Sequence, residues 1–311
     1  MTFSFIKKTF VIFLSFALLV ATLGCAKSFS DDGKISVVAT NFPAYDFASH
    51  VCKDIANVTM LLPAGAESHS YEPTAQDIIK IQNCDLFIYT GGESDVWVDK
   101  ILNALDNNVT TLKMTDCVSL LPVGNSDAHS HDHSHDEFDE HVWTSPVNAI
   151  KIIKKISDNL TELDAVNADV YKNNANDYIN EITELDCDFR NFFSTIEKKQ
   201  MIFGDRFPLV YFAKEYDIKY EAAFPGCADH SEPGAETIAN LIEKIDSENI
   251  STVYYIEFSN HNIADTLAEA TGASTTLFHS CHNVSKEQIL AGVTYVSLMR
   301  DNLETLKLTM K

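Results

Sequence analysis

A long stretch without glycine or proline, from Asp164 to Lys198, constrains the fold more than any other feature of the sequence. Apolar residues recur along it at roughly helical spacing, at Ala165, Val170, Tyr178, Ile182, Leu185 and Phe189. At 1.5 Å per residue, one helix over this stretch would span roughly 50 Å. One small domain needs no such length, so the stretch predicts a rigid helix that joins two lobes.

The residues before this helix alternate between β-branched or apolar runs and amphipathic segments. Strands are predicted at Lys34–Thr40, Val58–Leu62, Asp85–Tyr89 and Val109–Lys113, and helices at Pro43–Ile55, Thr74–Asn83 and Asp95–Leu105. Ser145 and Pro146 then provide an N-cap and a first-turn proline for a further helix. Strands separated by helices predict parallel βαβ units with both sheet faces covered.

The same alternation returns after the long helix. Strands are predicted at Gln200–Phe203, Ile218–Phe224, Thr252–Phe258 and Ser274–Phe278, and helices at Phe207–Tyr216, Glu236–Ser247, Ile263–Thr271 and Lys286–Met310. The predicted fold is therefore α/β, with two lobes that each hold a mostly parallel sheet flanked by helices. Ligands of such sheets collect outside the carboxyl ends of the strands, which here face the cleft between the lobes.

The N-terminus predicts export from the cytoplasm. Lys7 and Lys8 precede an apolar run, Val11–Leu23, that is too short to cross a membrane comfortably. The run ends just before Cys25, as in the lipobox of bacterial lipoproteins, although Thr22 stands where that box prefers leucine. Cys25 is thus predicted to be acylated and to hold the protein at a membrane surface without spanning it. The alternative is a cleaved signal peptide and a freely secreted protein.

These features divide the chain into five parts. They are a lipoprotein signal peptide at 1–24, a tether at 25–34, an N-terminal α/β lobe at 35–145 that includes a histidine-rich acidic loop at 124–140, a helical segment at 146–199, and a C-terminal α/β lobe at 200–311.

Charge and cysteine content exclude several classes of protein. The formal net charge of −22 argues against nucleic acid and against anionic lipid as partners. Apart from Cys25 there are six cysteines, which allow fifteen pairings in an oxidising compartment. No CxxC occurs, so a zinc ribbon is not expected.

The loop from Asp127 to Pro146 reads DAHSHDHSHDEFDEHVWTSP. Imidazoles suit zinc and its neighbours, whereas carboxylates suit harder ions, so this mixture predicts a loop that gathers divalent cations. The alternatives are a purification tag, which would normally sit at a terminus, or a solvated loop. The predicted collecting residues are His129, His131, His133 and His135.

Other histidines follow the predicted strands of both lobes. His69 and His141 belong to the first lobe, His230 follows the strand ending at Phe224, and His279 and His282 follow the last strand. Alone, each would more often be a surface or hydrogen-bonded residue. Because four loops would bring imidazoles to one cleft edge, they jointly predict a tetrahedral zinc site.

Several segments resemble the zinc/manganese solute-binding lipoproteins of bacterial ABC importers. The resemblance runs from about Ile35 to the C-terminus, and is carried by PAGAESHSYEPT, NCDLFIYTGGES, DEHVWTSPVNAIKI and the acidic histidine loop. It implies that His69 and His141 bind the metal. It also implies two α/β lobes joined by a rigid helix, and a protein that hands metal to a membrane permease and does no chemistry.

The second lobe departs from the family pattern. Many relatives have His or Glu at the start of an HDAF-like segment, where this chain has Gly204 and Asp205. Gly204 has no side chain to bind metal, so Asp205 or His230 would have to substitute. The fourth ligand, usually an Asp, corresponds to His279, and the added nitrogen favours zinc over manganese. The predicted ligands are His69, His141, His230 and His279, with Asp205 as a reserve oxygen ligand.

Cys227 and Cys281 lie beside His230 and His279 in the sequence. They would either join two strand-end loops by a disulfide, which an oxidising compartment favours, or give a thiolate to the metal. Glu257, at the end of a third strand, would either accept an imidazole N–H or be an ordinary exposed carboxylate.

The sequence therefore predicts a lipid-anchored, extracytoplasmic monomer that captures Zn²⁺, with Mn²⁺ as the alternative, and delivers it to an ABC permease and its ATPase. It is not expected to be an enzyme. The rival functions are a secreted zinc hydrolase, against which the absence of HExxH argues, and a surface adhesin with a structural metal.

Overall fold

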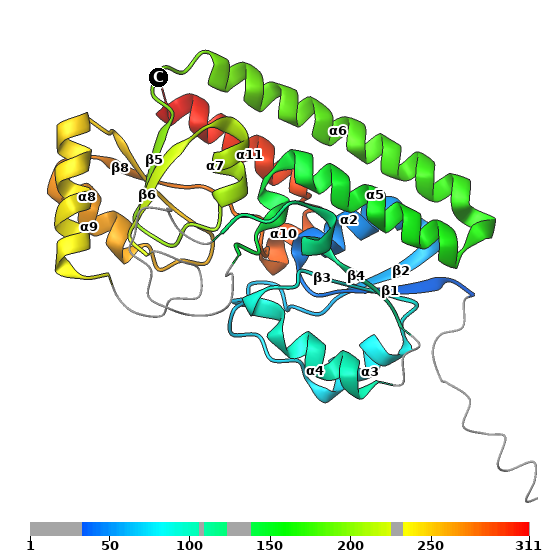
Figure 1. Cartoon of the computed structure of the whole chain (residues 1–311). Helices are drawn as coiled ribbons and strands as arrows, with labels where there is room; N and C mark the ends of the chain where they lie inside the picture. The colour runs from blue at the N-terminus through cyan, green and yellow to red at the C-terminus, as the bar shows by residue number, and fades with distance from the viewer. Residues whose placement is uncertain (1–32, 106–108, 123–137, 225–232, 311) are drawn as a thin grey trace, which may run out of the picture. The chain divides into compact units, whose positions relative to one another are not determined.

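The computed structural model describes residues 33–105, 109–122, 138–224 and 233–310, in which two four-stranded parallel sheets share one pattern of strand order. The order is β2-β1-β3-β4 in the first sheet and β6-β5-β7-β8 in the second (Figure 1). The strands are β1 Ile35–Ala39, β2 Ala56–Met60, β3 Leu86–Tyr89, β4 Thr110–Lys113, β5 Gln200–Phe203, β6 Lys219–Ala222, β7 Thr252–Tyr255 and β8 Ser274–Leu277. The predicted two-lobed α/β fold is confirmed.

Helices cover both faces of each sheet, as parallel strands require. Figure 1 shows α3 and α4 on one face of the first sheet and α2 and α5 on the other, while α8 and α9 flank the second sheet opposite α7 and α11. Their bounds are α2 Phe42–Cys52, α3 Ala75–Asn83, α4 Val96–Ala104, α5 Pro146–Leu163, α7 Val210–Tyr216, α8 Ala235–Glu248, α9 Asn262–Thr271, α10 Lys286–Leu290 and α11 Tyr295–Thr309. Helices α10 and α11 replace the single helix predicted at Lys286–Met310. The break lies near Gly292, where φ is +71°.

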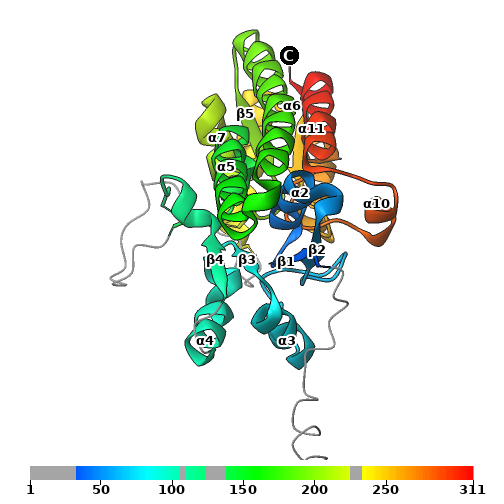
Figure 2. The same cartoon turned by 90° about the vertical axis from the view of Figure 1, so that its right-hand side faces the viewer.

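The long connecting helix, α6, spans Ala168–Ser194 and leads into the second sheet. Its 27 residues correspond to about 40 Å. The predicted helix was thus right at its centre but too long at both ends. At the N-terminal side, the Asp164 carboxylate accepts hydrogen bonds from the Asn167 side chain at 2.7 Å and from the Tyr171 hydroxyl at 3.1 Å. Such side-chain bonds stabilise a turn without glycine or proline, and α5 and α6 therefore pack side by side (Figure 2).

One apolar core is shared by the two sheets. It includes Val37 of β1 and Phe203 of β5, together with buried residues of α2, α5, α6 and α11. Smaller clusters lie under α3 and α4 and under α8 and α9. The largest side chain in the shared core is Trp143, which is fully buried. The interior therefore joins the lobes as well as filling each of them.

Several predicted features fall on residues outside the described ranges. They are the signal peptide, the lipidation site Cys25, and the accessory histidines His129, His131, His133 and His135. Among the helices that the structure describes, none combines the length and the apolar character needed to cross a bilayer.

Asp46 on α2 makes the stability of the fold depend on pH. It is buried and accepts a hydrogen bond from the Tyr178 hydroxyl of α6. Burial raises its pKa from 3.8 to about 6, although His50 and Tyr178 oppose the shift. The folded state therefore holds a proton that the unfolded state has lost, and stability falls as pH rises from about 4 to about 6.

We expect Asp46→Asn to remove this dependence, because the amide stays neutral and can still accept from Tyr178. The Asp46 contribution is at most about 3 kcal/mol between pH 4 and pH 7, at 1.36 kcal/mol per pKa unit. Urea unfolding at both pH values measures it, with Asp158→Asn on the exposed face of α5 as the matched control. Equal pH slopes for Asp46→Asn and the wild type would contradict the assignment.

Candidate metal centre

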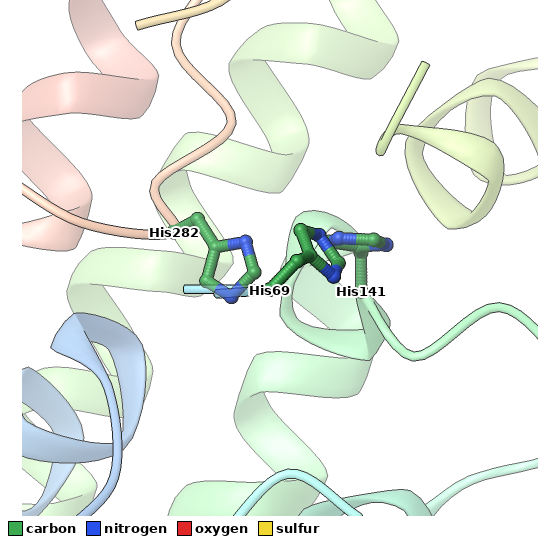
Figure 3. A group of neighbouring side chains, drawn as sticks. All are labelled: His69, His141 and His282. Carbon is green, nitrogen blue, oxygen red and sulfur yellow. The ribbon is translucent and has the colours of Figure 1, made fainter. Parts of the chain in front are cut away.

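Three histidines from distant parts of the chain converge at the carboxyl ends of the strands (Figure 3). His69 lies in the loop after β2, His141 precedes the short 3-10 turn Val142–Thr144, and His282 lies in the loop after β8. One ring nitrogen of each lies within 4.8 Å of the others. The ring centroids are 5.2 to 5.7 Å apart, and their side chains are largely buried.

Carboxylates lie behind the two imidazoles of the first lobe. The Asp139 carboxylate is 3.1 Å from His141 Nδ1 and also accepts the His141 backbone N–H at 2.9 Å. The Glu140 carboxylate is 3.6 Å from His69 Nδ1 and accepts the Ser94 backbone N–H at 3.0 Å. A carboxylate behind a ligating histidine fixes its ring orientation and makes the imidazole more basic.

His282 is prepared to bind as a neutral imidazole. Its Nδ1 is 3.2 Å from the Ser68 hydroxyl, and within the described residues its buried Nε2 has no hydrogen-bond partner. Burial lowers the pKa of His282 well below 6.5, and the neighbouring His141 and His69 lower it further. The ring is therefore unprotonated near neutral pH, which is the form that coordinates a metal.

Glu257 shapes the loop that carries His282. Its carboxylate accepts hydrogen bonds from the Ser280 backbone N–H at 2.7 Å, the Ser280 hydroxyl at 2.6 Å and the His282 backbone N–H at 3.1 Å. Between these residues Cys281 adopts a φ of +61°, a left-handed conformation that is costly for a side chain larger than glycine. The three hydrogen bonds stabilise this turn.

The same loop is also bound to the first lobe. The Asn283 side chain donates to the backbone carbonyls of Pro63 and Ala66 at 2.8 and 2.9 Å. The Trp143 indole N–H donates to the Ser280 carbonyl at 2.9 Å. His282 therefore comes from the second lobe in sequence but is held against the first.

We expect Glu257→Gln to weaken metal binding by about 10- to 100-fold, the usual cost of losing a residue that orients a ligand. The amide can accept fewer of the three hydrogen bonds, so His282 is positioned less well. Zinc competition titrations measure the change, and Glu243→Gln on the exposed face of α8 is the control. An unchanged affinity for Glu257→Gln would show that the loop holds its shape without the carboxylate.

The structure brings two of the predicted ligands into this group and leaves a third outside it. His69 and His141 belong to the group, whereas His279 does not. His279 makes its hydrogen bonds with other buried residues. Its backbone N–H donates to the Asn302 side chain at 2.7 Å, and its Nδ1 accepts the Cys281 N–H at 2.9 Å. The residue that joins the group is His282, the second histidine of LFHSCHN, whose strand-end position was a sequence signal in its own right.

Asp205, the predicted reserve ligand, has both carboxylate oxygens bonded to the backbone. They accept the N–H groups of Arg206 at 2.8 Å and Ile256 at 3.2 Å. Gly204 beside it packs against α9, where an added Cβ would lie 2.3 Å from the Ala264 Cα. The segment therefore needs glycine for close packing, and no side chain can replace it there.

The remaining predictions for the second lobe involve residues outside the described ranges. His230 and Cys227 both lie there, so neither the His230 ligand nor the disulfide partner of Cys281 is described. Cys281 itself is fully buried beside the site.

The comparisons with known proteins agree with this architecture. The family model described as ZnuA, zinc-uptake complex component A periplasmic, matches residues 37–308. The chain is 34% identical to the zinc-binding lipoprotein AdcA of Streptococcus pneumoniae R6 over 304 residues, which cover 94% of this chain and 60% of AdcA. It is 32% identical to the high-affinity zinc uptake system protein ZnuA of Bacillus subtilis over 309 residues, covering 96% and 95% of the two chains.

Solved structures give the same result. The Zn(II)-bound ZnuA-like domain of Streptococcus pneumoniae AdcA aligns with a TM-score of 0.75 at 34% identity, covering 89% of this chain and 99% of that domain. The metal-dependent lipoprotein YcdH from Bacillus subtilis aligns with a TM-score of 0.77 at 31% identity, covering 89% and 100%. The likeness to the laminin-binding adhesin Lmb of Streptococcus agalactiae, at 24% identity, shows the fold alone. The chain belongs to the family of zinc-uptake complex component A, the periplasmic ZnuA family.

Proposed function

We propose that this protein captures Zn²⁺ outside the cytoplasm and passes it to an ABC-type importer, with His69, His141 and His282 as ligands. The observation that carries the proposal is the convergence of three buried imidazoles from loops far apart in the sequence. Each ring is backed by a hydrogen-bond partner or a carboxylate. Such support is typical of metal-binding histidines.

The donor set favours zinc over manganese. Imidazole nitrogen suits zinc, whereas manganese prefers more carboxylate, carbonyl and water oxygens. The two bacterial relatives are named for zinc binding and zinc uptake. A transported ion must also be released, and three ligands on loops allow release more readily than a closed four-ligand structural site.

Family membership supports a proposal for the partners and the location. We infer that the protein acts with a membrane permease and its ATPase, as a binding component without enzymatic activity and as a monomer. A lipid anchor at Cys25 would hold it at the outer face of the cell membrane, in agreement with the lipoprotein names of its relatives. The chain spans about 60% of the length of the AdcA relatives. Delivery of zinc to a permease by this chain is therefore a proposal that needs its own experiment.

A zinc titration of the purified protein tests the capture step, and a variant with residues 123–137 replaced by a short Gly-Ser linker tests the role of the histidine-rich loop. We expect one tight site in both proteins and additional weaker zinc binding only in the wild type. Asp139 and Glu140 must stay in the variant because they contact His141 and His69. A wild-type protein without a tight zinc site would refute the function, and loss of the tight site in the variant would assign that site to the loop.

A further inference from the structure

The three histidines line a pocket that is partly open to solvent. Its empty space, counted together with the part open to solvent, is about 370 Å³. Beyond the histidines its lining includes Arg206, Pro208 and Phe258 of the second lobe. Because this side of the pocket is open, a small molecule from solution can reach the histidines.

The described side chains leave the fourth position of a zinc tetrahedron open. Only His69, His141 and His282 form the group of potential ligands among the described residues. Two of the nearby carboxylates have other partners: Asp205 accepts two backbone N–H groups, and Glu257 accepts three hydrogen bonds from the His282 loop. Zinc commonly takes four ligands, and the group formed by the described residues supplies three of them.

Arg206 is the one lysine or arginine side chain among the described residues that line this pocket. It forms an ion pair with Glu67 at 3.8 Å, a separation too long for a hydrogen bond. A guanidinium repels a metal cation nearby, and a bound anion reduces that repulsion. It also binds carboxylates through two parallel N–H donors, which is the strongest pairing available to it.

We propose that the pocket takes zinc together with a small dicarboxylate, which gives one carboxylate to the metal and the other to Arg206. The proposal rests on the zinc function above and names the ligand that completes that site. The exogenous acid would supply the fourth metal ligand and neutralise the guanidinium in one step. A dicarboxylate offers a separate carboxylate to each of the two partners.

Malonate is the probe, measured at a free zinc concentration fixed by a metal buffer. We expect saturating malonate to raise the apparent zinc affinity of the wild type at least about tenfold, equivalent to one well-made charged interaction. Acetate, with one carboxylate, should have less than about a threefold effect. The ratio of affinities with and without malonate should fall to about one in Arg206→Gln and be intermediate in Arg206→Lys. Arg190→Gln, on the exposed face of α6, should keep the wild-type ratio.

The visible absorption spectrum of the cobalt(II)-substituted protein gives a second readout that does not depend on affinity. Malonate should change the ligand-field bands of the wild type and leave those of Arg206→Gln unchanged. If zinc binds tightly and malonate changes neither affinity nor spectrum, the fourth ligand comes from the chain or from water, and the dicarboxylate proposal is wrong while zinc capture stands. If zinc alone fails to bind with or without malonate, the capture function itself is wrong.

Discussion

His282→Asn should weaken zinc binding by at least about 100-fold, more than the usual loss of a supporting residue. Asparagine keeps a polar group near the position of Nδ1, beside the Ser68 hydroxyl, but removes Nε2. The loop should therefore keep its shape while the metal loses one of its three imidazoles. Competition with a zinc chelator of known affinity measures the effect, and the unchanged circular dichroism spectrum confirms folding.

The matched variant is His279→Asn, which separates the two histidines of the LFHSCHN loop. Its amide can still accept the Cys281 N–H, the bond that His279 Nδ1 makes now. We expect a loss of about tenfold or less, the range of a supporting residue, and no loss for the exposed His261→Asn. The reverse ranking, with His279→Asn the more damaging, would restore His279 as the ligand.

Trp143→Ala should lower the free energy of unfolding by about 3–5 kcal/mol, the usual cost of truncating a large buried aromatic residue. Trp143 is fully buried in the core that the two sheets share, and its ring lies 5.3 Å from that of His141 and 4.9 Å from that of His282. The variant should also bind zinc more weakly, because both rings pack against the indole. Urea unfolding and zinc titration measure the two effects.

Two further variants separate packing from hydrogen bonding. Trp143→Phe keeps most of the volume but leaves the Ser280 carbonyl without the indole N–H, at a cost of about 1–3 kcal/mol. Trp97→Ala, in the smaller cluster under α4 where the indole is only partly buried, should cost less than Trp143→Ala and spare zinc binding. If Trp97→Ala and Trp143→Ala lowered the free energy of unfolding equally, the shared core would contribute no more to stability than the smaller cluster.

The fold was predictable from the sequence because each sheet is built from local signals. Buried runs such as Leu86–Tyr89 have almost no polar residues, and capped amphipathic helices separate them, so parallel pairing follows. The predicted helix ends were less accurate where side-chain hydrogen bonds determine where a helix stops. The Asp164 turn that separates α5 from α6 is an example.

The site was only partly predictable, for reasons of backbone geometry. His69 and His141 lie in segments that resemble the family motifs, so both were predicted as ligands, and the structure places both in the histidine group. The choice between His279 and His282 depends on the left-handed turn at Cys281 and on the hydrogen bonds of Glu257 and Asn302. Periodicity carries no information about such a turn.

Asp139 and Glu140 show a second limit of the sequence. Both were grouped with the acidic histidine-rich loop, but both are buried and contact the histidines of the site. A run of acidic residues gives no sign of where solvated carboxylates end and buried ones begin. Only the contacts of Asp139 and Glu140 show that the buried carboxylates begin there.

The shared apolar core has a consequence for how metal enters and leaves. A wide hinge motion between the lobes would expose to water the interior formed by α2, α5, α6 and α11, at about 25 cal/mol for each Å² of apolar surface. Exposing a few hundred Å² would cost as much as a typical domain's whole stability. We therefore infer that the two lobes behave as one body when metal enters and leaves.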